Sequence, residues 1–243
     1  MKRRLVMACA LLAAPAWGTP PGSIVSSFRS PCTGSAYGVD YHGGYLYHAD
    51  GGSRRVFYVT NTAGSVVATI PDLTAAVGID RTDAEFWTSN YSGWVSRVST
   101  NGSTIRRFRI PGQVRGYGIT YGNGYLWCDT APGSTRRVYQ FTTYGSVASS
   151  FTPPGAAAGG LCWDAPHLWY ADSLNPTGLI YRITTSGSVV TSINVPGARP
   201  RGITRQGPYL WYTDFNKSWV YQITIGFTAA RPASLGRVKA LFR

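Results

Sequence analysis

The stretch YGITYGNGYLW, residues 117–127, decides the fold, because copies of its two halves recur throughout the chain. The first half returns at 37–40, 77–80, 160–163 and 201–204, and the second at 45–47, 85–87, 167–169 and 209–211. We name these apolar runs a and b. Both are rich in aromatic and β-branched residues and are bounded by Gly, Asn, Asp or Pro, a pattern typical of short strands.

Two more runs complete each copy. Run c, such as 137–141, follows run b, and run d begins at a Gly-Ser pair and ends at proline, as in 145–154. The Gly-Ser pairs lie at 22, 64, 102, 145 and 187. A period of roughly forty residues with four strand-like runs in each copy is typical of β-propeller blades. We therefore predict an all-β, five-bladed propeller with four antiparallel strands per blade over residues 19–226.

The order of the runs predicts how the ring closes. Runs a, b and c occur five times, but run d follows run c only four times. The fifth run d is found at the other end of the chain, over residues 22–28. We expect this N-terminal strand to complete the last blade, which avoids an unclosed array. An open solenoid with capping repeats is the alternative.

These repeats, Gly-Ile-x-Tyr-x-x-Gly-Tyr-Leu-Trp followed by Gly-Ser-Val, resemble the NHL, YVTN and SMP-30-like group of propeller repeats over residues 22–226. The resemblance implies the propeller fold. The group includes lactonases and antibiotic lyases, which use metal-binding carboxylates or a His–Glu arrangement. This chain departs from both patterns, because Glu85 is its single glutamate. Those activities are therefore not carried over.

Both ends of the chain have a composition unlike the repeats. Residues 1–18 have a basic start, an apolar core and small residues before Thr19, which predicts a cleaved signal peptide. We expect the mature chain to be secreted, periplasmic or on the cell surface, without a transmembrane segment. Residues 227–243 form a linker and a basic amphipathic tail. The tail resembles the Ser-x-Gly-x-x-Lys-Ala-x-x-Arg endings of exported proteins, which implies sorting or anchoring; a frayed terminus is the alternative.

The net charge indicates which classes of partner to expect, and the cysteines indicate which disulfides to expect. The net charge of +13 favours acidic polymers such as uronate-containing or sulfated polysaccharide, although a generic basic surface gives the same value. We expect a polysaccharide, an anionic surface polymer or a protein as partner, and not nucleic acid. Export permits disulfides. Cys128 and Cys162 fall in adjacent blades and form a possible bridge, whereas Cys32 is expected to be free.

The loops at one end of the ring carry the candidate ligand-binding residues. The d–a and b–c loops are expected to share one face. Arginines in the d–a loops make one side of this face cationic beside a gap of small residues at 155–160, and guanidinium groups suit carboxylate or sulfate. Ordinary exposed arginines are the alternative. The candidate residues are Arg115, Tyr117, Arg199, Arg201, Tyr91 and Phe215, with Trp94 and Trp219 as further loop aromatics.

An enzyme is the second hypothesis. Asp40 and Asp80 lie on run a of adjacent blades and could form a carboxylate pair or a metal site in the channel. This alternative predicts a metal-dependent hydrolase or lyase of the SMP-30 or antibiotic-lyase type. Glycoside hydrolysis needs two positioned carboxylates, which a single glutamate makes hard to supply. We predict instead a secreted, non-catalytic binding module that needs no cofactor or metal, has no catalytic residue, and recognises a glycan or anionic surface polymer.

Overall fold

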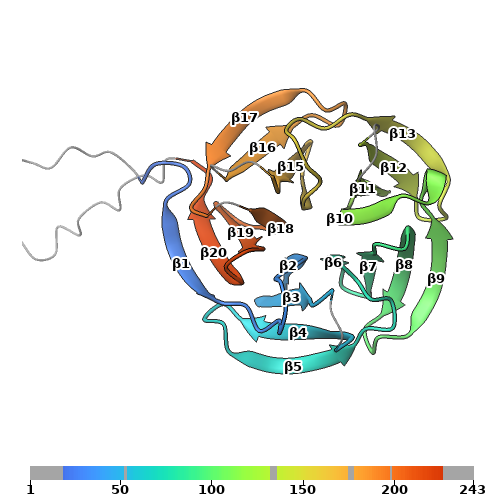
Figure 1. Cartoon of the computed structure of the whole chain (residues 1–243), viewed down its shortest axis with the longest axis horizontal. Helices are drawn as coiled ribbons and strands as arrows, with labels where there is room; N and C mark the ends of the chain where they lie inside the picture. The colour runs from blue at the N-terminus through green and yellow to red at the C-terminus, as the bar shows by residue number, and fades with distance from the viewer. Residues whose placement is uncertain (1–18, 52–53, 132–135, 175–177, 198, 227–243) are drawn as a thin grey trace, which may run out of the picture.

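The computed structural model describes residues 19–51, 54–131, 136–174, 178–197 and 199–226. Within these residues, twenty strands form five separate four-stranded antiparallel sheets, which are arranged as blades around a central axis (Figure 1). The predicted five-bladed propeller is confirmed, and the open solenoid is excluded. The expected signal peptide and C-terminal tail lie outside the described residues.

Each blade uses runs a to d in order from the axis outward. Blades one to three are β2 (Val39–His42), β3 (Tyr45–Ala49), β4 (Val56–Asn61), β5 (Val66–Pro71); β6 (Gly78–Arg81), β7 (Glu85–Ser89), β8 (Trp94–Ser99), β9 (Thr104–Arg109); and β10 (Arg115–Gly122), β11 (Tyr125–Ala131), β12 (Val138–Thr142), β13 (Val147–Phe151). Blades four and five are β14 (Leu161–Asp164), β15 (His167–Asp172), β16 (Leu179–Ile183), β17 (Val189–Asn194); and β18 (Pro200–Gln206), β19 (Tyr209–Asp214), β20 (Trp219–Thr224), with β1 (Ile24–Arg29) outermost. A short 3-10 turn, η1 (Pro111–Gln113), precedes β10.

The ring closes as predicted. Strand β1 pairs antiparallel with β20, and Phe28 lies opposite Val220. The Ser26 hydroxyl donates a hydrogen bond of 3.1 Å to the Gln222 side-chain oxygen across this pair. Residues from the two ends of the chain therefore share one blade, beside each other in Figure 1.

The hydrophobic core is divided into five layers, one between each pair of adjacent blades. In the layer that joins blade five to blade one, Trp211 packs with Val39 and Leu46, and all three side chains are buried. The other four clusters each combine residues of two neighbouring blades in the same way. Each sheet is thus packed on both faces, which accounts for the weak alternation of apolar and polar residues in the sequence.

A ring of glycines brings the innermost strands into direct contact. A Cβ atom on Gly118 would lie 2.5 Å from both the Gly159 oxygen and the Leu161 nitrogen of the next blade. Real Cβ atoms do not come this close to backbone atoms. Every blade repeats this contact, so each inner strand touches the next one through a residue without a side chain. The five glycines are Gly38, Gly78, Gly118, Gly160 and Gly202.

In four of the five blades, the side chain two residues after this glycine accepts a hydrogen bond from a backbone N–H of the next blade. Thr120 accepts from Trp163 at 3.0 Å, and Asp80 accepts from Tyr121 at 3.0 Å. The remaining pairs are Asp40 with Arg81 and Thr204 with Tyr41. These bonds form a belt around the channel. In blade four, Cys162 stands at this position and its thiol donates to the Trp163 oxygen. Cys162 thus takes the place of Thr120 in blade four, one position away from the alignment by sequence.

The possible disulfide between Cys128 and Cys162 is a wrong prediction, because both thiols are free. Cys128 packs in the layer between blades two and three, beside Trp87 and Ile119. Cys162 packs in the layer between blades four and five. The two side chains therefore face different inter-blade layers. Cys32 is free, as expected, and is buried.

Candidate ligand-binding site at the channel mouth

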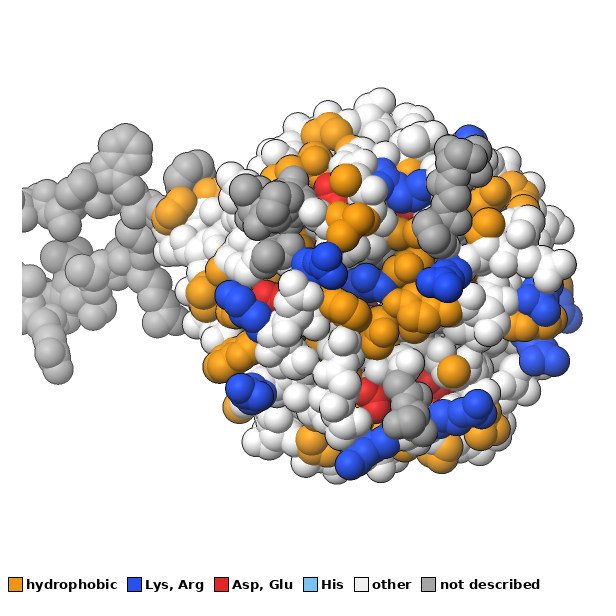
Figure 2. All heavy atoms as spheres, in the orientation of Figure 1, with side chains coloured by type: hydrophobic (Ala, Val, Ile, Leu, Met, Phe, Trp, Pro, Cys, Tyr) orange, Lys and Arg blue, Asp and Glu red, His pale blue; other side chains and the backbone are white. Residues whose placement is uncertain are grey.

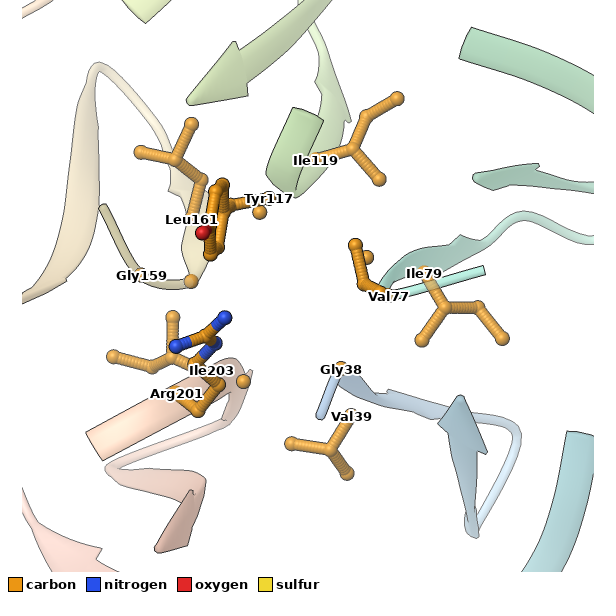
Figure 3. Close-up of a pocket in the computed structure, with 14 residues that line it drawn as sticks. Gly38, Val39, Val77, Ile79, Tyr117, Ile119, Gly159, Leu161, Arg201 and Ile203 are labelled. Carbon is orange, nitrogen blue, oxygen red and sulfur yellow. The ribbon is translucent and has the colours of Figure 1, made fainter. Parts of the chain in front are cut away.

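The d–a and b–c loops meet around one end of the channel, as the sequence predicts. Figure 2 shows basic and hydrophobic side chains gathered at the centre of this face. Below the mouth, the channel wall consists mainly of backbone and the glycine ring. Figure 3 shows the side chains of Val39, Ile79 and Ile119 directed away from the axis, into the layers between blades. Larger side chains therefore gather at the mouth.

The Arg201 side chain lies at the mouth inside a box of aromatic rings. Its guanidinium carbon is 4.5 Å from the ring centre of Tyr117, 4.8 Å from that of Phe215 and 5.4 Å from that of Tyr37. The guanidinium also donates a hydrogen bond to the Tyr91 hydroxyl. Aromatic faces attract cations, and this attraction strengthens where water is partly excluded. The box therefore fixes both the position and the orientation of Arg201.

The rings of the box support one another. Tyr37 makes edge contacts with Tyr91, at 5.8 Å between ring centres, and with Phe215, at 5.3 Å. Tyr91 makes a similar contact with Tyr117 at 5.0 Å. Burial raises the pKa of Tyr91 far above its usual value, so its phenol stays neutral despite the neighbouring guanidinium. The rings and the neutral phenol thus hold Arg201 while leaving its positive charge available to a ligand.

A depression opens beside this box over blades three, four and five, and contains about 630 Å³ of space including its open part. Arg199, Arg201 and Arg136 line it, and no Asp or Glu is among the described residues that line it. The small side chains of residues 156–158 form its side at blade four, where the sequence predicts a gap. Arg136 is committed to the loop carbonyls of Pro153, Pro154 and Gly155, at 2.7–2.9 Å. Among the described hydrogen bonds and ion pairs, Arg199 has no side-chain partner.

The structure brings most of the sequence-predicted site residues together. Tyr91, Tyr117, Arg201 and Phe215 form one cluster, and Arg199 faces the adjoining depression. Arg115 lies at the edge of the cluster, with its guanidinium 5.7 Å from the Tyr91 ring centre. Their contact with a ligand stays a prediction.

Two loop aromatics lie away from the cluster. Trp94 packs under Arg107 and Arg109, and Trp219 stacks on Tyr221 in β20.

Sequence reasoning missed two residues of the mouth. Tyr37 occupies the same repeat position as Tyr117, a signal that was available. Arg136 had no such signal, because its partners lie on a distant loop.

Asp40 and Asp80 lie in the belt inside the channel and not at the mouth. Asp40 accepts bonds from the Arg81 N–H and the Thr204 hydroxyl, and Asp80 accepts from the Thr120 hydroxyl. Burial raises the pKa of Asp80 to about 6, and burial together with the Asp80 charge raises that of Asp40 well above its usual value. Within the described residues, no group of three or more His, Cys, Asp or Glu is arranged to hold a metal.

The sequence matches no family model. No curated protein matches it either. Solved structures share the fold at low sequence identity. Glutaminyl cyclase from Myxococcus xanthus aligns with a TM-score of 0.68 and 14% identity, over 86% of this chain and 100% of that one.

Two other solved structures are similar over somewhat less of the chain. A catalytically inactive virginiamycin B lyase from Staphylococcus aureus, solved with quinupristin, gives a TM-score of 0.50 and 21% identity, over 78% of this chain and 66% of that one. A chain of a nidogen–laminin complex gives 0.54 and 15%, over 78% and 76%. These likenesses establish a β-propeller, a fold that both enzymes and binding proteins use. Membership of the NHL, YVTN or SMP-30-like group stays a prediction.

Proposed function

We propose that this protein is an exported binding module that recognises an acidic glycan or another anionic surface polymer at the channel mouth. One observation carries the proposal: Arg199 and Arg201 line the same depression, and no carboxylate lies with them in the described part of its lining. A carboxylate or sulfate group placed between the two guanidiniums would complete an arrangement that the protein itself leaves open. Its volume is in the range of small-molecule sites.

The geometry of Arg201 favours binding of an anion. Guanidinium groups bind carboxylate and sulfate through paired hydrogen bonds in one plane. The rings of Tyr117 and Phe215 already hold the Arg201 guanidinium, so little side-chain freedom remains to be lost when a ligand binds. Half-burial also lowers the local dielectric, which strengthens attraction to the ligand relative to an arginine in open solvent.

The hydrolase or lyase alternative has less support from the geometry. Asp40 and Asp80 already accept hydrogen bonds that join neighbouring blades. At the mouth, the Ser173 hydroxyl lines the depression but donates to the Ala158 carbonyl. A nucleophile needs a base positioned to take its proton, and this hydroxyl points its proton at a backbone oxygen. The lining favours holding an anion over transforming it.

Export is part of the proposal and rests on residues 1–18, whose composition is that of a signal peptide. We expect the mature protein to begin at Thr19. Mass spectrometry of the protein recovered from outside the cytoplasm of its expression host would measure this. An intact Met1 in that fraction would contradict the proposed cleavage. The described part of the chain contains no helix long and apolar enough to cross a membrane.

Binding is tested with oligogalacturonate, an acidic sugar chain, and with dextran as its neutral counterpart. Calorimetry at low and moderate salt would compare wild type with Arg199→Ala and Arg201→Ala. We expect each variant to bind at least about tenfold more weakly, because a charge-assisted hydrogen bond contributes on the order of 1.5–3 kcal/mol. The matched control is Arg29→Ala, which removes an exposed arginine from β1 on the outer rim.

Three outcomes decide between a site and generic charge. Loss of affinity in Arg199→Ala with none in Arg29→Ala supports a site at the mouth. Equal small losses in all three variants, or binding that moderate salt abolishes for every polyanion, would show generic attraction. Equal binding of dextran and oligogalacturonate would contradict recognition of acidic groups.

A further inference from the structure

The outer strand of blade two departs from the repeat at two positions. Arg106 and Arg107 lie in the middle of β9, and their side chains are exposed. The other four outer strands carry small residues at the matching register positions. These are Ala68 and Thr69, Ser149 and Ser150, Thr191 and Ser192, and Ser26 and Ser27. Four outer strands thus form without arginine at these two positions. The fold therefore does not require Arg106 and Arg107, and their presence needs another explanation.

These arginines are held in place on both faces of the sheet edge. The Arg107 guanidinium carbon lies 4.4 Å from the ring centre of Trp94, and that of Arg109 lies 3.9 Å from it. On the opposite face, Arg106 lies 4.7 Å from the ring centre of Tyr144, which comes from blade three. Figure 2 shows basic side chains beside hydrophobic ones at the right-hand rim, where Figure 1 places β8 and β9.

The backbone of β9 is open for pairing. Among the strands of the described residues, β9 is the outermost of its sheet and pairs with β8 alone. The Ile110 N–H donates to the Gly93 oxygen at 3.0 Å, and inward hydrogen bonding alternates along an antiparallel strand. Phe108 therefore faces β8 with its backbone groups, while the N–H and C=O of Arg107 and Arg109 point outward. Free backbone groups and guanidiniums thus lie on the same edge.

The positive charge at this edge is not neutralised by the described part of the protein. Four ion pairs are found among the described residues, and none involves Arg106, Arg107 or Arg109. The nearby carboxylate of Glu85 is already paired with Arg97 at 2.5 Å. A charged edge also protects a strand from unwanted pairing. Protection does not account for β9, because the other four rims lack charges at these positions.

We propose that β9 is a docking edge for an acidic peptide segment of a partner protein, which adds to blade two as a fifth strand. Backbone hydrogen bonds to Arg107 and Arg109 would supply affinity, and Asp or Glu side chains of the partner would pair with the arginines. The arginines flank both faces of the edge. An extended strand, whose side chains alternate between faces, reaches both of them, whereas a sugar chain lying on one face does not.

The probe is a fluorescein-labelled peptide of repeating Glu-Glu-Val units, with a Gln-Gln-Val peptide as the neutral control. Fluorescence anisotropy would compare wild type with the double variant Arg106→Ser, Arg107→Ser, which installs the pair found in β13. We expect at least about tenfold weaker binding in this variant, since two charge-assisted contacts are lost. Arg29→Ala, which removes an exposed arginine from the outer strand of another blade, is the control and should bind the peptide like wild type. Arg199→Ala is measured beside it to test whether the channel mouth contributes.

A second pair of variants separates strand pairing from charge alone. Arg107→Ser keeps the outward N–H, and Arg107→Pro removes both the charge and this N–H without breaking the ladder to β8. We expect Arg107→Pro to bind about fivefold more weakly than Arg107→Ser, the effect of one backbone hydrogen bond. Thermal melting of both variants checks that the blade is intact.

Two results would overturn the proposal. Equal affinities of Arg107→Pro and Arg107→Ser would show that any polyanion binds there by charge, an acidic glycan included. A loss of peptide binding in Arg199→Ala, with none in the β9 double variant, would show that the peptide binds at the channel mouth and not at β9. Neither result affects the oligogalacturonate test, because the two surfaces are altered by different variants.

Discussion

The channel wall and the channel mouth are built from the same inner strands but follow opposite rules. In the wall, a glycine recurs in every blade and a hydrogen-bond acceptor in four of the five, at Gly118 and Thr120 in blade three, for example. At the mouth, the residue before each glycine changes from blade to blade, from Tyr117 to Gly159 to Arg201. Two adjacent positions of the same strand are therefore under different constraints: close packing requires the glycine, whereas the residue before it can vary. Positions that repeat in every blade maintain the fold, and positions that differ between blades are candidate binding residues.

The largest effect on folding stability is expected when a methyl group is added to a glycine of the channel wall. Gly118→Ala puts a Cβ atom 2.5 Å from backbone atoms of blade four, and neither inner strand can move without opening the ring. We expect a loss of about 3–5 kcal/mol in the free energy of unfolding, or failure to fold. Urea unfolding followed by tryptophan fluorescence would measure it.

Gly34→Ala is the matched control for this prediction. A Cβ atom on Gly34 would meet no other atom within 4 Å, and this glycine has no positive φ. Its replacement should therefore change stability by less than about 0.5 kcal/mol. Equal effects of the two substitutions would contradict the role of the glycine ring in holding the inner strands together.

A smaller effect is expected from the belt, and it depends on pH. The folded state raises the pKa of Asp80 to about 6 by burial, so it binds this proton more tightly than the unfolded chain does. The free energy of unfolding should therefore be highest at acid pH and fall between about pH 4 and pH 6. Asp80→Asn keeps an acceptor for the Tyr121 N–H and removes the part of this fall that Asp80 contributes, whereas burial keeps the pKa of Asp40 and Asp129 raised. We expect it to stabilise the protein by about 1–2 kcal/mol at pH 8.

The same variant separates the belt from the metal-site alternative. If Asp40 and Asp80 held a divalent cation, calcium, magnesium, manganese or zinc would raise the melting temperature of wild type, and Asp80→Asn would lose this rise. We expect no rise in wild type, because the carboxylate oxygens already accept hydrogen bonds from neighbouring blades. A cation-dependent rise that disappears in Asp80→Asn would restore the enzyme hypothesis.

The smallest effects on stability are expected at the mouth, where they sharpen the contrast with the wall. Arg201→Ala removes the cation from the aromatic box, and we expect a loss of about 1 kcal/mol. Arg199→Ala removes no described side-chain bond and should change stability by less than about 0.5 kcal/mol. Differential scanning calorimetry would measure both. A large loss in Arg199→Ala would show that this residue is structural.

Much of the architecture was readable from the sequence because each blade repeats the same physical solution. The count of strand-like runs predicted closure by residues 22–28, since a ring must have as many outer strands as inner ones. The mouth was readable in part, because Arg201 and Arg199 lie in a segment that differs from the matching segments of the other blades. Cys162 shows the limit: a shift of one residue in aligning blade four hid that it occupies the position of Thr120. Side-chain direction was equally hidden, so adjacent strands suggested a disulfide between thiols that face different layers.

Closure by β1 also sets the order of events when the chain folds. Ser26 and its partner Gln222 are 196 residues apart in sequence, so this pair forms only after nearly the whole chain is available. Closing so long a loop is entropically costly, and contacts of this kind slow folding. The propeller strand that comes first in the sequence is therefore the last to be placed. Until β1 docks, β20 is an unpaired edge strand. The β1–β20 pair is therefore where the ring is expected to open, and where a strand from another molecule would compete with β1.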